Sequence, residues 1–424
     1  MQPNLRNLAL WLLTALLVSG CDIAAEEVPD ATVTTSPSAT ATLAATAVTP
    51  EPVQELVLWV APAYAPDQDT EASAIFSARL DAFIETHPNV SLIVRTKSNQ
   101  GDSGLLQMLI SANLAAPDTL PDLVTLDQEA LAVAAAEGIL LPLEDWGDPP
   151  ADEEWYDFSV LSARTENIFF GLPFAGDAEV FAYRSARFND IPLTWERLLD
   201  ENNLFCWPLA DPLAALTIGE YRLLGGELAD DEGQPMLQPG ILSTVLAFYA
   251  DAQAAQLLPP FTLTAASSEA CWEALSVDQV SAGVVPLENL IHQVGNSLSA
   301  VPIPSRDESG LSFVNTWSWG LTSQRPERIV LAGELAAWLS DPAFVGEWSQ
   351  ALGYLPARAS ALATWDDERQ LALASSLVTL ASTRPSSAFL LPFSAAITTA
   401  IGDVLTREIT PAVAASNAVR AIQE

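Results

Sequence analysis

The sequence predicts an α/β protein with parallel sheets, organised as about two domains. The chain has 424 residues, of which half are hydrophobic and 17% are charged, so it is long enough to bury more than one core. From Glu55 onward, short apolar segments alternate with amphipathic ones, and the same alternation begins again after Gly171. Strands that alternate with helices form parallel sheets covered on both faces, so this order favours two α/β units.

The first unit contains three predicted strands, each followed by a helix. Apolar residues at positions 76, 80, 83 and 84 share one face of the first helix, which Pro88 ends. The predicted elements are a strand at 56–60, that helix, a strand at 90–94, a helix at 104–115, a strand at 123–126 and a helix at 128–137. Ligands of open sheets bind beyond the carboxyl ends of the strands, which are residues 61–64, 95–100 and Asp127 here.

The second unit follows Gly171-Leu172-Pro173 and has the same order of elements. Thr194 is a good N-cap for a helix to about residue 201, and Gly225-Gly226 ends another helix. The other predicted elements are strands at 180–183, 206–209 and 283–285 and helices at 212–224 and 241–255. From residue 325 to the end, the pattern is mainly helical.

The N-terminus resembles the signal peptide of a bacterial lipoprotein. An apolar run at 8–18 leads into Val18-Ser19-Gly20-Cys21, and it is about half as long as the ~20 residues that a spanning helix needs. We therefore expect residues 1–20 to be removed and Cys21 to carry lipid, on the outer face of the cytoplasmic membrane in the cell envelope. An uncleaved signal anchor is the alternative. Residues 21–54, rich in Ala, Thr, Ser and Pro, are expected to be a disordered tether.

The composition counts against several functions. The net charge is -37, with Lys97 as the single lysine, so the surface repels phosphate backbones and nucleic-acid binding is not expected. A place outside the cytoplasmic membrane counts against roles that need cytoplasmic ATP or NAD. With two histidines, His87 and His292, and no closely spaced cysteines, no metal site and no cofactor are expected.

Two cysteines remain once Cys21 carries lipid. Cys206 belongs to a strand-like segment and Cys271 to a helix-like one. In an oxidising compartment the two could form a disulfide, and two buried thiols are the alternative.

A series of short segments carries a resemblance to a known family. In chain order they are FIETHPNV (83–90), LPDLVTLD (120–127), GILLPL (138–143), GLPFAGDAEVFAY (171–183), TWERL (194–198), WSWGL (317–321), GYLPAR (353–358) and a helical tail (395–422). Together they are similar to the family 1 extracellular solute-binding proteins, the maltose-binding-like receptors of ABC importers. Each segment alone is a weak signal, whereas their joint order is specific.

The resemblance implies a periplasmic-binding-protein-like fold of type II, with two α/β lobes, a hinge and a ligand cleft between the lobes. Lobe 1 is expected at 55–172 plus 313–356, and lobe 2 at 173–312 plus 357–424. The implied ligand is a sugar or oligosaccharide, and the implied partner is the transmembrane part of an ABC permease. A monomer is expected.

Sugars present hydroxyls at their rim and C–H groups on their faces, so a sugar site needs carboxylates or amides together with aromatic rings. Asp177, in the loop-like Phe174-Ala175-Gly176-Asp177, corresponds to a family position where an acid contacts the ligand, and it could instead cap a backbone amide. Asp127 ends a strand at the crevice and is equally suited to cap the next helix.

The remaining candidates follow from position along the chain. Trp317 and Trp319 belong to an expected hinge strand, and we expect one of them in the cleft and the other in a core. Tyr64 follows the first strand, and Glu288 and Asn289 follow the strand at 283–285. With Phe174 and the two aspartates, these residues form the predicted ligand site.

Three classes of function remain open. The first is a transport receptor that delivers solute to a permease, and the second is a sensory lipoprotein of the same fold. The third is a hydrolase: the segment Gly101-Asp102-Ser103-Gly104 matches the tetrapeptide around a chymotrypsin-like nucleophile, and a pair of glycosidase carboxylates could lie among 54 acids. No local pattern selects a histidine base for that serine or a particular pair of acids, so an enzyme is not expected.

Overall fold

The computed structural model describes residues 53–99, 101, 104–150, 154–295, 297–322, 326–406 and 408–423. The predicted signal peptide, the lipidated Cys21 and all but the last two residues of the predicted tether lie outside the described residues, as do Asp102 and Ser103 of the protease-like tetrapeptide. Residues 51–424 form one compact unit.

A long mixed sheet organises this unit. Seven strands follow one another in the order β2-β1-β3-β10-β6-β8-β7. They are β1 (Gln54–Val60), β2 (Val90–Thr96), β3 (Leu123–Asp127), β6 (Leu172–Tyr183), β7 (Phe205–Cys206), β8 (Ala282–Pro286) and β10 (Ser312–Leu321). Strands β1, β2 and β3 are parallel, as the alternating sequence predicts, whereas β10 is antiparallel to β3 and to β6. The shorter strands are β4 (Arg164–Thr165), β5 (Ile168–Phe169), β9 (Ser299–Val301), β11 (Leu355–Pro356) and β12 (Ala381–Thr383).

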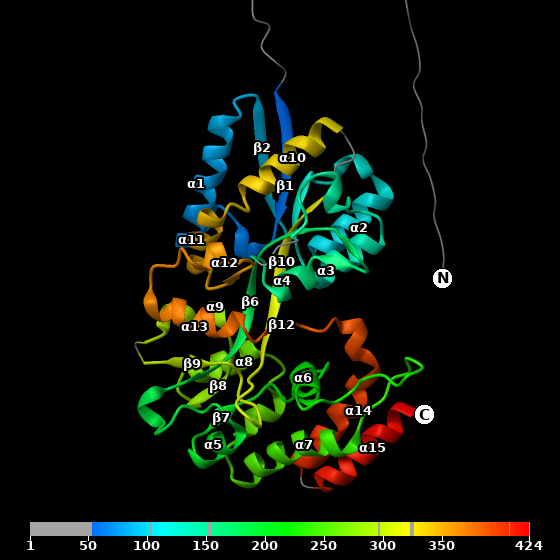
Figure 1. Cartoon of the computed structure of the whole chain (residues 1–424), viewed down its shortest axis with the longest axis vertical. Helices are drawn as coiled ribbons and strands as arrows, with labels where there is room; N and C mark the ends of the chain where they lie inside the picture. Colours follow the sequence, from blue (N-terminus) through cyan, green and yellow to red (C-terminus); the bar gives the residue numbers. More distant parts are fainter. Residues whose placement is uncertain are drawn as a thin grey trace, which may run out of the picture. The chain divides into compact units, whose positions relative to one another are not determined.

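Strands β6 and β10 are the longest, and they connect two halves of the sheet. At one end β10 pairs with β3, and at the other end β6 pairs with β8. Figure 1 shows both strands running from the upper half, with β1 and β2, to the lower half, with β7 and β8. In the middle, residues 175–178 of β6 pair with residues 314–317 of β10. We call this middle part the crossing region.

Helices cover both faces of the upper half of the sheet. One face packs against α1 (Glu71–Thr86), α10 (Pro326–Trp338) and α11 (Pro342–Leu352) through a cluster that includes Phe76, Leu335 and Trp348. The other face packs against α2 (Leu105–Ala115) and α3 (Gln128–Ala136). Because β1 is buried on both faces, it reads in the sequence as an unbroken apolar run rather than as an alternating one.

The lower half has two further buried clusters. The first joins β6 and β8 to α5 (Trp195–Asp200), α6 (Ala215–Leu223), α7 (Pro239–Ala254), α14 (Ser387–Leu405) and α15 (Pro411–Gln423). The second lies on the opposite face with α4 (Asp157–Ser162), α8 (Ser268–Ser276), α9 (Leu287–Leu290) and α13 (Glu368–Val378). Helix α12 (Ala359–Leu362) packs beside α11.

Helix α14 is long and apolar enough to cross a membrane by length and composition. In the structure one of its faces, with Leu390, Ile397 and Val404, packs in the core of the lower half against α7 and α15. We therefore interpret α14 as a core helix.

Three of the predicted elements differ from the observed ones by three residues or more at one end. β6 begins eight residues before the predicted strand, because its first part pairs with β10, a partner that local sequence does not reveal. The predicted strand at 206–209 pairs only at Phe205–Cys206, since Pro208 has no N–H to donate to a ladder. The predicted helix at 212–224 begins at Ala215, after Asp211 and a left-handed Ala214 form its start.

Cys206 and Cys271 form a disulfide, with their Cα atoms 5.3 Å apart. It joins β7 to α8, so the N-terminal end of α8 is held beside the lower half of the sheet. Both cysteines are fully buried.

Candidate functional site

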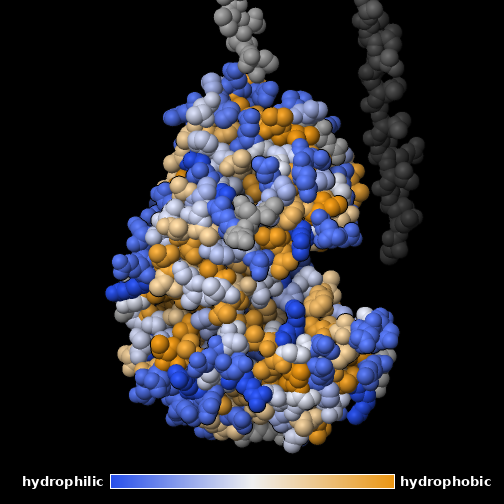
Figure 2. Space-filling model, in the orientation of Figure 1, coloured by the Kyte–Doolittle hydropathy of each residue, from blue (hydrophilic) through white to orange (hydrophobic). Residues whose placement is uncertain are grey.

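The two halves meet near the crossing region through a chain segment that follows β12. The Nε2 atom of Gln128, at the start of α3, donates a hydrogen bond to the backbone carbonyl of Arg384. The hydroxyl of Ser387 donates to Oε2 of Glu129 at 2.9 Å. Figure 2 shows a notch on the right of the surface, between the half that holds α2 and α3 and the half that holds α6 and α14. The start of α3 and the segment at 384–387 therefore bridge the two halves.

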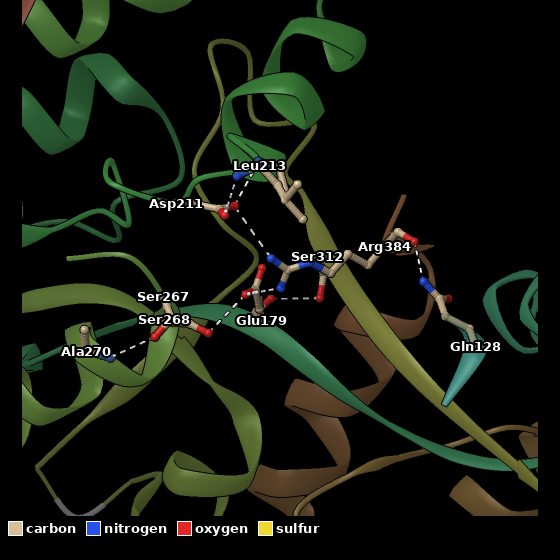
Figure 3. Close-up of polar contacts among 10 residues, drawn as sticks. Gln128, Glu179, Asp211, Leu213, Ser267, Ser268, Ala270, Ser312 and Arg384 are labelled. Carbon is tan, nitrogen blue, oxygen red and sulfur yellow. Dashed lines mark hydrogen bonds and ion pairs between the residues drawn. The ribbon is translucent and has the colours of Figure 1, made fainter. Parts of the chain in front are cut away.

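A polar cluster lies where these segments meet the sheet. We call it the Arg384 cluster, and it consists of Arg384, Glu179, Asp211, Ser268 and Ser312. The Arg384 guanidinium lies between two carboxylates: Nη1 is 3.2 Å from Oε1 of Glu179, and Nη2 is 3.7 Å from Oδ2 of Asp211 (Figure 3). Three distant parts of the chain thus meet at one guanidinium.

Neighbouring groups hold both carboxylates of the Arg384 cluster in place. Ser268 donates to Oε1 of Glu179 at 3.0 Å, and Ser312 donates to its backbone carbonyl at 2.9 Å (Figure 3). Asp211 accepts from the backbone N–H groups of Leu213 and Ala215, at 3.0 and 2.9 Å. The cluster is therefore preorganised by its own backbone and hydroxyl contacts.

Burial and pairing have opposite effects on Glu179. Burial raises the pKa of Glu179 above its usual value, while the charge of Arg384 and the hydrogen bond from Ser268 lower that pKa. The side chains of Glu179 and Asp211 are 14% and 10% exposed, and that of Arg384 is 37% exposed. The arginine is therefore the most accessible member of the trio.

A second polar cluster, the Asp177 cluster, adjoins the first. It consists of Asp177, Glu288, Tyr354 and Tyr64. The backbone N–H of Glu288 donates to Oδ1 of Asp177 at 3.2 Å. Burial, followed by the nearby charge of Glu288, raises the pKa of Asp177 well above its usual value. Burial disfavours the charged form of the carboxyl group, and the neighbouring carboxylate repels it. Burial also raises the pKa of Glu288, while a hydrogen bond from Tyr354 opposes that rise.

The two clusters belong to one face of one strand. Asp177 and Glu179 are two residues apart on β6, so their side chains point to the same side of the sheet. The sequence thus brings two acids together by strand periodicity alone, and the fold adds Asp211, Glu288 and Arg384 from elsewhere.

The predicted aromatic residues form a buried wall next to the Asp177 cluster. The Tyr64 ring is 5.2 Å from the rings of both Phe174 and Trp317, and the Trp319 ring stacks on Phe174 at 4.8 Å. Trp317 is 7% exposed and Trp319 is fully buried, and both belong to the core of the upper half together with Trp348. The structure therefore brings all four predicted aromatic residues together, in a core rather than at an open surface.

The other predicted residues lie at the edges of these clusters. Asp127 accepts a hydrogen bond from the backbone N–H of Ala130 at 2.8 Å, so it is the N-cap of α3, and burial raises its pKa. That position places it one residue from Gln128, at the bridge between the halves. Asn289 follows Glu288 on α9 and is partly exposed.

The sequence-based site missed Arg384, Glu179 and Asp211. A usable signal existed for Glu179, because it follows the predicted Asp177 at strand spacing. Arg384 is one of only 17 Lys and Arg residues in the chain, and it stands in the short polar segment Thr383-Arg384-Pro385. Asp211, however, has no local pattern that separates it from the other acids.

The acids near the crossing region do not form a metal site by geometry. Across the described ranges, no group of three or more His, Cys, Asp or Glu side chains lies close enough together to hold an ion. The chemistry of the two clusters is hydrogen bonding and charge pairing.

A two-half α/β fold whose long antiparallel strands join both halves is a periplasmic-binding-protein-like fold of type II, which confirms the predicted fold class. The chain belongs to the bacterial extracellular solute-binding proteins, and the sequence pattern of that family matches residues 78–372. Among curated protein sequences, none matches this chain significantly.

Solved structures with this fold cover nearly the whole described chain. One is the cyclic alpha-maltosyl-1,6-maltose binding protein of Arthrobacter globiformis, with a TM-score of 0.68, 17% identity and coverage of 88% of this chain and 98% of that one. Another is maltose-bound MalE3 of T. maritima, with a TM-score of 0.65, 17% identity and coverage of 87% and 99%. A third, an ABC transporter solute-binding protein of Thermotoga lettingae bound with alpha-D-tagatose, has a TM-score of 0.64, 19% identity and coverage of 87% and 98%. At these identities the likeness concerns the fold.

Proposed function

We propose that this protein is the substrate-binding lipoprotein of an ABC importer, and that it captures a sugar or oligosaccharide between its two halves and delivers it to a permease. The observation that carries this proposal is the Arg384 cluster. It gathers charged and hydroxyl groups at the place where two halves of the fold meet. A solute that contacts both halves stabilises the closed arrangement by what an open one cannot offer.

The proposed lobes are residues 55–172 plus 313–356 and residues 173–312 plus 357–424. The distribution of buried clusters supports this division. One large cluster draws on Leu56 to Ala175 and on Trp317 to Ala361, and another on Phe181 to Phe313 and on Leu390 to Ala418. Helix α4 is an exception, because it lies within the proposed first lobe by sequence but packs in the second cluster of the lower half. The chain passes between these two clusters along β6, along β10 and after α12. These three segments form the proposed hinge.

The chemistry near the crossing region suits a polyhydroxylated solute. Carboxylates and a guanidinium accept from and donate to hydroxyl groups, and aromatic rings contact the C–H faces of a sugar ring. The Arg384 cluster offers the first kind of group, and the wall formed by Tyr64, Phe174, Trp317 and Trp319 adjoins it through the Asp177 cluster. We propose that hinge opening exposes part of this wall to the solute.

The proposed place of the protein is the outer face of the cytoplasmic membrane, anchored through lipid on Cys21. A monomer on a tether could reach the transmembrane subunits of a permease. The family is a family of binding proteins, so we propose no catalytic step for either cluster.

A sensory lipoprotein of the same fold is the alternative function. Both functions require capture of a solute, and they differ in the partner that reads the closed form. Docking of the purified, solute-loaded protein to permease-containing membranes, against membranes without permease, separates them.

A screen of neutral mono- and oligosaccharides by thermal unfolding and tryptophan fluorescence tests the proposed capture. The chain has 12 tryptophans, two of them, Trp317 and Trp319, in the wall near the crossing region, so closure is expected to change the emission. At 100 times the dissociation constant, a bound sugar stabilises the folded protein by about 2.7 kcal/mol. No stabilisation by any saccharide would contradict the proposal, and turnover of a stabilising saccharide would favour a hydrolase.

Asp177 is expected to contact the solute, and its substitution separates contact from a purely structural role. We expect Asp177→Ala to weaken saccharide binding by about 10-fold or more, because a hydrogen bond to a carboxyl group is lost. Asp177→Asn keeps an acceptor for the Glu288 N–H and removes an ionisable group that burial disfavours, so the variant is expected to fold at least as stably as the parent. Titration calorimetry measures both affinities, and an unchanged affinity in the alanine variant would refute the contact.

A further inference from the structure

A cavity of about 800 Å³ lies outside both clusters, against helix α10. Its walls come from the turn that contains Trp146, from Glu154 and Trp155, from one side of α10, and from Ser340 and Arg358. Among the described residues that line it, none belongs to the Arg384 cluster or to the Asp177 cluster. The cavity is therefore separate from the proposed solute site.

Negative charge dominates the rim of this cavity. Five carboxylate residues and one arginine line it within the described part of the chain: Glu144, Asp145, Asp148, Glu154, Glu334 and Arg358. Glu334 also lies 3.5 Å from His87, and Glu154 accepts a hydrogen bond from Ser360. A cavity with this excess of carboxylates favours a cation over a neutral or anionic molecule.

Apolar and aromatic residues also line the cavity. Trp146 and Trp155 are partly exposed, and Ile329, Val330 and Ala337 of α10 add aliphatic surface. The guanidinium of Arg358 lies 4.9 Å from the centre of the Trp155 ring, which is cation–π distance. The protein thus already places one organic cation against one of the two tryptophans.

A buried hydroxyl provides an independent indication of a ligand. Ser340 lines the cavity and is 4% exposed, and its Oγ atom has no hydrogen-bond partner among the described residues. A buried polar group without a partner is uncommon, since most such groups are satisfied by protein, water or ligand. A donor from a bound molecule would satisfy this oxygen.

We propose that the cavity beside α10 is a second binding site, which takes a small organic cation with an ammonium group on an apolar body. The rim carboxylates pair with the ammonium, the tryptophans contact the apolar body, and Ser340 accepts a hydrogen bond. A bare metal ion does not fit this site, since within the described ranges no three of its acids come together as ligands.

Titration calorimetry with putrescine, in ~150 mM salt to screen general attraction, tests the proposal. We expect saturable binding to a single site. The matched neutral probe is 1,4-butanediol, which has the same four-carbon body without charge, and it is expected not to bind. Absence of saturable heat with putrescine would overturn the proposal.

Matched charge variants decide whether the cavity is the site. Glu144→Gln with Asp148→Asn is expected to weaken putrescine binding by about 10-fold, since two exposed charge contacts are lost. The control, Asp231→Asn with Glu232→Gln, removes the same charge from an exposed turn elsewhere and is expected to leave the affinity unchanged. An equal loss in both double variants would mean that putrescine responds to the overall charge of -37, and it would overturn the proposal.

Ser340→Ala tests the buried hydroxyl directly. It is expected to weaken putrescine binding several-fold while leaving the thermal unfolding temperature of the free protein unchanged or higher, because an unpartnered oxygen is removed. An unchanged affinity would remove Ser340 from the site. Saccharide binding is expected to be unaffected by these variants, so failure of this proposal and failure of the proposed solute capture are distinguishable.

Discussion

Replacing Glu220 by glutamine is expected to stabilise the protein at pH 8 by about 3–5 kcal/mol. Glu220 lies in the core of the lower half and is 1% exposed, and burial raises its pKa from 4.5 to about 8. A difference of about 3.5 pKa units, at 1.36 kcal/mol each, corresponds to about 5 kcal/mol. Tyr249 donates a hydrogen bond to Oε2 of Glu220, and a glutamine carbonyl can accept the same bond.

The direction of the pH effect follows from the raised pKa of Glu220. Below pH 4.5 the carboxyl is protonated in both the folded and the unfolded chain, and its contribution to stability is at its largest. Between pH 4.5 and about 8 the unfolded chain loses the proton while the folded one keeps it, so the stability falls as the pH rises. The parent and the Glu220→Gln variant are therefore expected to differ little near pH 4.5 and most at pH 8.

Chemical denaturation at several pH values measures this difference. Glu196→Gln, on the exposed side of α5, is the matched control and is expected to leave the pH dependence of the parent unchanged. A Glu220→Gln variant whose free energy of unfolding follows the parent at every pH would contradict the assignment of a buried, neutral Glu220.

Replacing Arg384 by methionine is expected to remove saccharide-dependent stabilisation and to lower the free energy of unfolding by about 1–3 kcal/mol. The methionine keeps most of the apolar stem but leaves the carboxylates of Glu179 and Asp211 without their shared cation. Breaking a buried ion pair costs about 3–5 kcal/mol, and the 37% exposure of Arg384 reduces that cost through solvent screening.

Two further variants control the Arg384 experiment. Arg197→Met breaks an ion pair with Glu308 whose side chains are 49% and 55% exposed, and it is expected to change stability by at most about 0.5 kcal/mol. Adding Glu179→Gln to Arg384→Met removes one of the two uncompensated charges, and it is expected to recover part of the stability without recovering saccharide binding. If Arg384→Met behaved like Arg197→Met in both measurements, the Arg384 cluster would not be the solute site.

Much of the fold could be predicted because its signals are local. The helix α1 shows its apolar residues at helical spacing and Pro88 predicts its end, while the structure adds Thr70 as its N-cap. The strands β1, β2 and β3 follow one another with helices between them, so their parallel pairing follows from order alone. The strand β12 was not predicted. It has only three residues, which pair with β10, and so short a segment shows no periodicity within a tail whose pattern is mainly helical.

The candidate site was harder to predict, because its members are far apart in the chain. Glu179 and Arg384 are separated by 205 residues, and no spacing in the sequence relates them. For Asp127 two roles were open, and the cap of α3 is the one that the coordinates show, while contact with a solute stays a prediction. Trp317 and Trp319 were expected to divide between a cleft and a core, yet both pack in one core, since residues two apart on a strand share a face and helix α11 adds Trp348 to the same cluster.

Local patterns in the chain were enough to establish the α/β class, the order of the longer elements and the family resemblance, since periodicity, capping and turn residues act over a few positions. The fold was needed to show that Cys206 meets Cys271, that Arg384 lies between Glu179 and Asp211, and that the aromatic residues share one core. The physical reason is that these contacts depend on the pairing of β6 with β10 and on the packing of distant helices. Such pairing is stabilised by burial and by hydrogen bonds between distant segments, and the local sequence of one segment does not identify its partner.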